Sequence, residues 1–246
     1  MKLHRWQVFL GISLVVLSAA LYCFHYVVFH DAHHIFLYMV GDVAFVPIEV
    51  LLVSLIIHSL LSRREKRIVL EKLNMVIGAF FSEAGTMLLA TFSDSDPGLG
   101  SIRKEMIVSN DWSDKEFEIV SQHLRSYNYG IDIAKVDFEN LRTFLLTKRD
   151  FMVRLLENPA LLEHETFTDL LRAVFHLTEE IQSRGDLAVL PDSDCQHLAG
   201  DIRRAYVLLV GEWLDYMRHL KNNYPYLFSL AMRTNPFDQE ASPVVK

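Results

Sequence analysis

Residues 35–61 read IFLYMVGDVAFVPIEVLLVSLIIHSLL, and the only formally charged side chains among these 27 residues are Asp42 and Glu49. As an α-helix rising 1.5 Å per residue, the run is about 40 Å long, whereas the hydrocarbon layer of a membrane is about 30 Å thick. We therefore predict that it crosses a membrane, either tilted or protruding at one end.

A second apolar run lies before it, from Trp6 to Phe29, with no formally charged side chain if His25 is neutral. A cleaved signal peptide is the alternative interpretation, but the run is longer than the apolar part of a typical signal peptide. Only five residues, 30–34, connect the two runs. Residues 1–61 are thus expected to form a tight antiparallel transmembrane hairpin, with spans at about 6–29 and 35–61.

Basic residues flank both outer ends of this hairpin. Lys2 and Arg5 precede the first span, and the sequence RREKR at 63–67 follows the second. Because Lys and Arg accumulate on the cytoplasmic side of spanning helices, both termini are predicted to be cytoplasmic and the histidine-rich connector to lie outside.

Residues 62–92 are predicted to form a basic juxtamembrane segment followed by an amphipathic linker helix. The part from Leu73 to Phe92 has Glu83 as its only charged residue, so a third span over 73–92 stays open as an alternative. Small and weakly polar residues recur on one helical face there, at Asn74, Gly78, Ser82 and Gly85. That periodicity favours a helix that continues from the second span and packs against protein.

The remainder, 93–246, is acidic. Its charged residues sum to −8, whereas those of residues 1–92 sum to +1, out of a total of −7. This argues against nucleic acid as a partner, since phosphate binding requires clustered cations. Two cysteines exclude a disulfide framework.

Helical periodicity, interrupted by turn residues, runs through this acidic part, and strand-like alternation is almost absent. Ser113 and Glu116 have the spacing of a capping box. The expected helices cover about 113–127, 136–157, 166–183, 192–220 (capped by Asp192 or Ser193) and 224–233. The predicted fold is therefore all-α, with a transmembrane hairpin, a linker helix and a cytoplasmic helical bundle.

The intramembrane carboxylates are the strongest functional signal, because ionisable groups inside a span are costly and mark functional sites. His34, Tyr38, Asp42 and Glu49 follow one another at helical intervals and share one stripe of the second span. Antiparallel pairing would bring His25 to the depth of Asp42 as its partner.

Two interpretations of this stripe stay open. The five residues Asp42, Glu49, His25, Tyr38 and His34 could line a cation or proton pathway, or sense an ion. They could instead only hold helices together. Since one hairpin cannot enclose a pore, the pathway requires a homo-oligomer.

The connector offers a second candidate site, for a divalent metal ion, at His30, Asp31, His33 and His34, although the spacing matches no standard zinc motif. In the bundle, acidic and histidine side chains share helical faces, which we interpret as solvated surface and a polar network. These residues are Glu165, Asp169, His176 and Glu180; Glu212, Asp215 and His219; and His197 with Asp201. Di-iron bundles pair Glu-x-x-His motifs, which this sequence lacks.

Four segments resemble a family of uncharacterised bacterial two-pass membrane proteins: HHIFLYMVGDVAFVPIEVLLVSLIIH (33–58), LNMVIGAFFSEAG (73–85), EHETFTDLLRAVFHLTEE (163–180) and EWLDYMRHLKNNYPYLFSLAMRTNPFD (212–238). The resemblance implies a bacterial inner membrane and carries no activity, cofactor or catalytic residue. Two further functions stay open, namely a membrane-anchored scaffold or adaptor that binds a cytosolic protein, and a metal-dependent bundle enzyme. No motif of an ordinary enzyme class is present.

Overall fold

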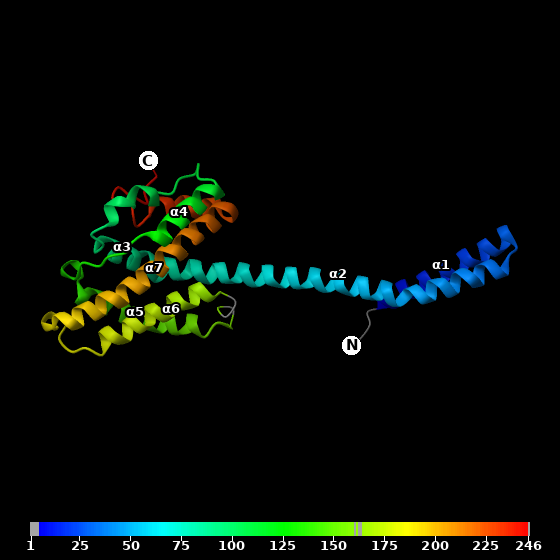
Figure 1. Ribbon diagram of the computed structural model, residues 1–246, viewed down its shortest axis with the longest axis horizontal. Coiled ribbons are helices and arrows are strands. Elements are labelled where there is room, and N and C mark those ends of the chain that lie inside the picture. The colour runs from blue at the N-terminus through cyan, green and yellow to red at the C-terminus, as the bar shows by residue number, and fades with distance from the viewer. Residues whose placement is uncertain (1–4, 160, 162–163, 246) are drawn as a thin grey trace. The chain divides into compact units, whose positions relative to one another are not determined.

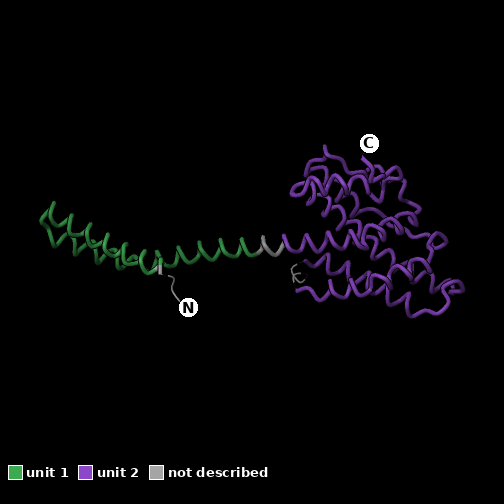
Figure 2. The backbone as a smooth tube through the Cα atoms, turned by 180° about the vertical axis from the view of Figure 1, so that it is seen from behind, with its two compact units in different colours: residues 1–65 green, residues 66–246 purple. Residues whose placement is uncertain are grey.

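The computed structural model describes residues 5–159, 161 and 164–245, and no strand occurs among them. The all-α fold predicted from the sequence is confirmed. The chain divides into two compact units, residues 1–65 and 66–246 (Figure 2). Lys2 and Lys246 lie outside the described residues.

The first unit is a helical hairpin made of α1 (Arg5–Phe29) and the first part of α2 (Ala32–Phe80). The chain reverses at His30, whose φ of 53° lies in the left-handed region and whose amide donates to the carbonyl of Tyr26 at 2.8 Å. Asp31 then caps the start of α2, because its Oδ1 accepts a hydrogen bond from the backbone amide of His34 at 3.0 Å.

The connector is therefore shorter than predicted. It consists of His30 and Asp31 only, whereas the sequence suggested residues 30–34. His33 and His34 belong to the first turn of α2, because the carboxylate cap at Asp31 starts the helix three residues before the apolar run does.

Three helical stretches are long and apolar enough to cross a membrane: Val8–Phe29, Ala32–Glu65 and Glu71–Asp94. In the first two stretches, none of the most apolar part is buried inside the protein. In the third stretch, 44% of the most apolar part is buried. The apolar surface of the hairpin thus has no protein covering within one chain, and that of the third stretch is partly covered.

The third stretch contributes to the core of the second unit. α2 continues without a break to Phe80 and is followed by a π-helical turn (Phe81–Gly85) and by α3 (Thr86–Asp94). Phe80 is fully buried, with its ring edge-on to Phe167 at 5.4 Å between centroids.

Part of the small-residue face predicted along this stretch is also in contact with other side chains, whereas Ser82 is exposed. A Cβ atom added at Gly78 would lie 3.1 Å from the hydroxyl of Tyr216, in the long helix α7 (Asp192–Asn223). One added at Gly85 would lie 2.7 Å from the rings of Phe80 and Phe81. The sequence analysis placed residues 73–92 in a linker separate from the bundle. In the structure they are part of the bundle, because their apolar side chains pack in its core.

The rest of the second unit is a bundle around one long helix. Its helices are α4 (Asp114–Ser126), α5 (Phe138–Leu156), α6 (Glu165–Gln182), α7 (Asp192–Asn223) and α8 (Pro225–Arg233), with single 3-10 turns at Leu99–Ser101, Arg103–Met106, Ile133–Lys135 and Leu187–Val189. α7 packs against α3, α4, α6 and α8 (Figure 1). The buried side chains of α7 therefore form the centre of the core.

Local sequence signals predicted most of these helices. Both halves of the capping box form, since the Ser113 amide donates to the carboxylate of Glu116 and the Glu116 amide donates to Ser113 Oγ. The predicted cap of α7 at Asp192 or Ser193 is wrong. Pro191, with extended backbone, takes that position, and Asp192 lies in the first turn, where its charge suits the helix dipole.

Phe80→Ala tests the assignment of this stretch to the bundle core. In residues 66–246 produced alone, the substitution should lower the free energy of unfolding by about 3–5 kcal/mol, because it leaves a cavity among buried rings. Chemical denaturation measures the change. Ile119→Ala, at a half-exposed position of α4, is the control and should change stability far less. Equal effects of the two substitutions would contradict the assignment.

Candidate functional site

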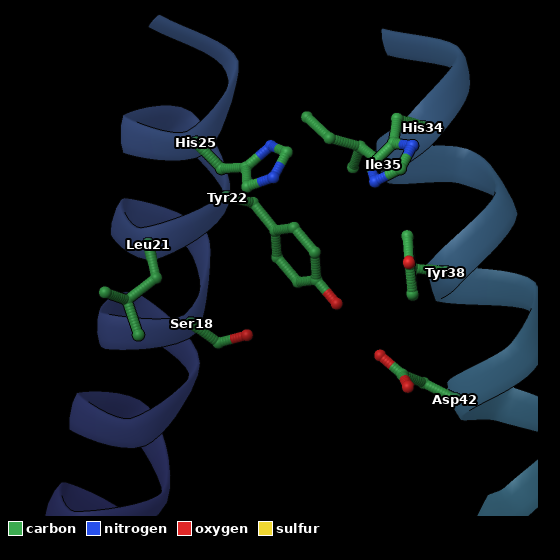
Figure 3. A pocket seen from close by; sticks show the side chains of 8 residues that line it. All are labelled: Ser18, Leu21, Tyr22, His25, His34, Ile35, Tyr38 and Asp42. Carbon is green, nitrogen blue, oxygen red and sulfur yellow. The ribbon is translucent and has the colours of Figure 1, made fainter. Parts of the chain in front are cut away.

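The hairpin contains a pocket of about 520 Å³ between α1 and α2 (Figure 3). Its lining residues are Ser18, Leu21, Tyr22 and His25 from α1, and His34, Ile35, Tyr38 and Asp42 from α2. In Figure 3 the hydroxyl of Tyr22 and the carboxylate of Asp42 both point into the space between the helices. The pocket thus brings hydroxyl, imidazole and carboxylate groups together on a hairpin whose other side chains are mainly apolar.

Four of the five residues predicted for an ion pathway line this pocket: His25, His34, Tyr38 and Asp42. Glu49 does not, and it is exposed on α2, seven residues beyond Asp42. Seven residues correspond to about 10.5 Å along a helix. The two carboxylates therefore lie at different positions along α2, one inside the pocket and one outside it.

The predicted pairing of His25 with Asp42 does not form. The ring of His25 instead stacks on that of His34, with centroids 6.3 Å apart and planes inclined by 3°. His25 Nδ1 is buried and accepts or donates no hydrogen bond. The short turn causes this arrangement, because a two-residue connector places residues 25 and 34 opposite each other and leaves Asp42 two turns further along α2.

The connector residues proposed as metal ligands do not converge within one chain. Asp31 uses one oxygen to cap α2, and that backbone bond lowers the pKa of its carboxyl. Among the residues that the structure describes, the ligand atoms of His30, Asp31, His33 and His34 do not form a group close enough to share one ion. A metal site at the connector stays a prediction.

The acidic and histidine side chains that the sequence placed on shared helical faces of the bundle differ in their exposure to solvent. Glu165, Asp169 and Asp215 are exposed, whereas Glu212 and Asp201 are buried. Burial raises the pKa of Glu212 and lowers that of His219. The helical faces read from the sequence therefore combine solvent-exposed and buried positions.

One polar cluster was missed by the sequence analysis. Asp96 is buried and accepts a hydrogen bond from the Tyr127 hydroxyl at 2.9 Å, and burial is the main cause of the raised pKa of Tyr127. The two residues are 31 positions apart, and Asp96 lies in a turn-rich stretch that is typically solvated. No local pattern could have indicated this contact.

Comparison with known proteins identifies the family. A model described as the N-terminal helical domain of MJ1433 matches residues 2–61, and one described as the C-terminal helical domain of the uncharacterized protein MJ1433 matches residues 69–233. The chain belongs to this family. The uncharacterized protein MJ1433 of Methanocaldococcus jannaschii is 48% identical over 237 residues, which cover 96% of this chain and 95% of the relative.

These matches confirm that the chain belongs to an uncharacterised family, as the resemblance implied. The bacterial source stays a prediction. No solved structure matches the chain. The boundary between the two matched domains, residues 62–68, lies close to the division between the two compact units.

Glu212→Gln tests the burial of that carboxyl group. A raised pKa in the folded bundle means that stability is full below the ordinary carboxyl range and is lost as the pH rises through the folded pKa. The substitution should therefore raise the melting temperature at neutral pH and flatten its dependence on pH. Glu179→Gln, at an exposed position of α6, should leave that dependence unchanged. A destabilised Glu212→Gln variant at neutral pH would contradict this account.

Proposed function

We propose that this is an integral membrane protein whose second spans assemble in a homo-oligomer and line a pathway for cations or protons. The observation that carries the proposal is the placement of Asp42 in a pocket with hydroxyl and imidazole groups, and of Glu49 on the exposed surface of the same apolar helix. A charged group on the lipid-facing side of a span costs at least about 2.5–3.5 kcal/mol, so a second protein surface or water is expected to cover it.

The two carboxylates would act at successive depths of this pathway. Counted from Ile35, Asp42 lies about 10 Å and Glu49 about 21 Å along a run of about 40 Å. In a helix tilted to fit a 30 Å layer, Glu49 would therefore lie near the middle of that layer. Pro47 cannot donate a backbone hydrogen bond, which leaves the carbonyl of Val43 without its helical partner. Carboxylate and carbonyl oxygens together would provide ligands for a cation.

The pocket would form the outer part of the pathway. His34 and Tyr38 lie one and two turns into α2 from the connector, and Asp42 lies one turn deeper. These groups can bind a proton or a hydrated cation before it reaches Glu49.

We further propose that both termini are cytoplasmic, in the inner membrane of a bacterial cell, and that the chain crosses the membrane twice. The basic residues at 63–67 support this orientation. The partial burial of Glu71–Asp94 supports two crossings, because the buried side chains of this stretch belong to the core of the bundle.

Glu49→Gln separates a pathway from a purely structural role. It keeps the size and most of the hydrogen bonding of the side chain while removing its charge. In liposomes at matched protein density, it should abolish cation or proton flux and leave the oligomer intact. Asp42→Asn should reduce flux less, because it lies nearer to outer water.

Ser13→Ala is the matched control, because the hydroxyl of Ser13 is already bonded to the carbonyl of Leu10 within α1. It should leave flux unchanged. Equal flux through the unmodified protein and Glu49→Gln would refute the pathway and leave membrane anchoring of the bundle, as a scaffold or adaptor, as the function.

Labelling of single cysteines tests the topology. In a background with Cys23 and Cys195 replaced by Ser, Ala32→Cys at the connector should react with a membrane-impermeant maleimide in intact cells. Ser242→Cys near the C-terminus should react only after permeabilisation. Reaction of both cysteines in intact cells would mean that residues 73–92 form a third span.

A further inference from the structure

Helices α6 and α7 each present a histidine and a carboxylate four residues apart. The pairs are His176 with Glu180 on α6 and His197 with Asp201 on α7. Residues four apart lie on one helical face, and the two helices pack against each other. The chain reverses between them at residues 183–191, so the histidine of each helix meets the carboxylate of the other.

Three of these groups have the spacing of ligands around one ion, because one ligand atom each of Glu180, His197 and Asp201 lies within 4.8 Å of the others. His197 Nε2 lies 3.4 Å from Asp201 Oδ2 and 3.5 Å from Glu180 Oε2. His176 Nε2 lies 3.7 Å from Asp201 Oδ2 and 3.8 Å from Glu180 Oε1. Ligand atoms about 2.1 Å from a tetrahedral ion are themselves about 3.4 Å apart.

Asp201 supplies an independent reason to expect a ligand. Its side chain is 4% exposed, and Oδ2 is buried and accepts no hydrogen bond. A buried carboxylate oxygen without a donor is costly, so a positive partner is expected between it and the two imidazole nitrogens that face it.

Two arginines bond the carboxylates of this cluster. Arg204 donates to Asp201 Oδ1 at 2.9 Å, which leaves Oδ2 directed at the histidines. Arg184 donates to Glu180 Oε2 at 2.8 Å and also bonds Asp194, and it lowers the pKa of both carboxyl groups. Bonds of this kind fix the orientation of metal ligands.

The arginines also reduce the negative charge available to a cation. The histidine nitrogens must therefore provide much of the affinity, which favours a divalent transition metal over Mg²⁺ or Ca²⁺. Both imidazoles are about half exposed, so an ion can enter from solvent and can keep a water or substrate ligand on that side.

We propose that Glu180, His197 and Asp201 form a binding site for one divalent transition-metal ion such as Zn²⁺, with His176 next to it. The site lies within the bundle and does not depend on the proposed pathway in the hairpin. From the sequence alone these residues were interpreted as part of a polar network, and the convergence of both helices at Asp201 Oδ2 is what points to an ion.

The test is Zn²⁺ binding to the full chain in detergent after treatment with a chelator, measured by calorimetry. One Zn²⁺ per chain should bind to this site, and His197→Gln and Asp201→Asn should each weaken that binding at least tenfold. His123→Gln is the control, because His123 lies on α4 and contacts Glu105 instead. Circular dichroism of each variant monitors folding, and the exposure of His197 makes its substitution compatible with an intact bundle.

Two results would overturn the proposal. Binding that is unchanged in His197→Gln and Asp201→Asn but lost in His33→Gln would place the ion at the connector. An absence of Zn²⁺ binding, together with a melting temperature that falls as the pH rises through the histidine range, would mean that protonated histidines are the partners of Asp201.

Discussion

The cost of removing a carboxylate from water is the constraint on which this account of the structure depends. On α2, Asp42 faces a pocket shared with α1, while Glu49 has no partner within its own hairpin. In the bundle, Asp201 is buried with one oxygen unsatisfied. In the proposed membrane a lipid environment makes the first case costly, and a protein interior makes the second costly. The proposed oligomer and the proposed metal ion would each supply the missing partner.

One helix carries residues that serve both units. α2 holds Asp42 and Glu49 in its first part and Leu73, Ile77 and Phe80, which belong to the bundle core, at its end. Because these core contacts anchor the end of α2 in the bundle, the segment up to Asp94 cannot leave the bundle without exposing buried rings. The apolarity of this segment is therefore explained by protein packing, and that of the hairpin is not.

The sequence predicted the helical architecture well, because its signals are local. Apolar run lengths indicated the hairpin, and the Ser113 and Glu116 spacing indicated α4. The connector length was misjudged, since the cap at Asp31 lies outside the apolar pattern that defined the span. Composition also could not decide whether lipid or protein covers residues 73–92, because both environments select the same side chains.

The candidate sites were predictable only in part. The stripe of His34, Tyr38 and Asp42 follows from helical periodicity, and all three line the pocket. The stacking of His25 on His34 depends on the register that the turn imposes, which periodicity does not contain. The convergence of His176 and Asp201 depends on how α6 and α7 pack, so a pattern within either helix could not reveal it.

The most direct test of this account is the oligomeric state of the full chain, measured by native mass spectrometry after release from lipid nanodiscs. It predicts one discrete homo-oligomer across a range of protein-to-lipid ratios, and a monomer at every ratio would contradict it.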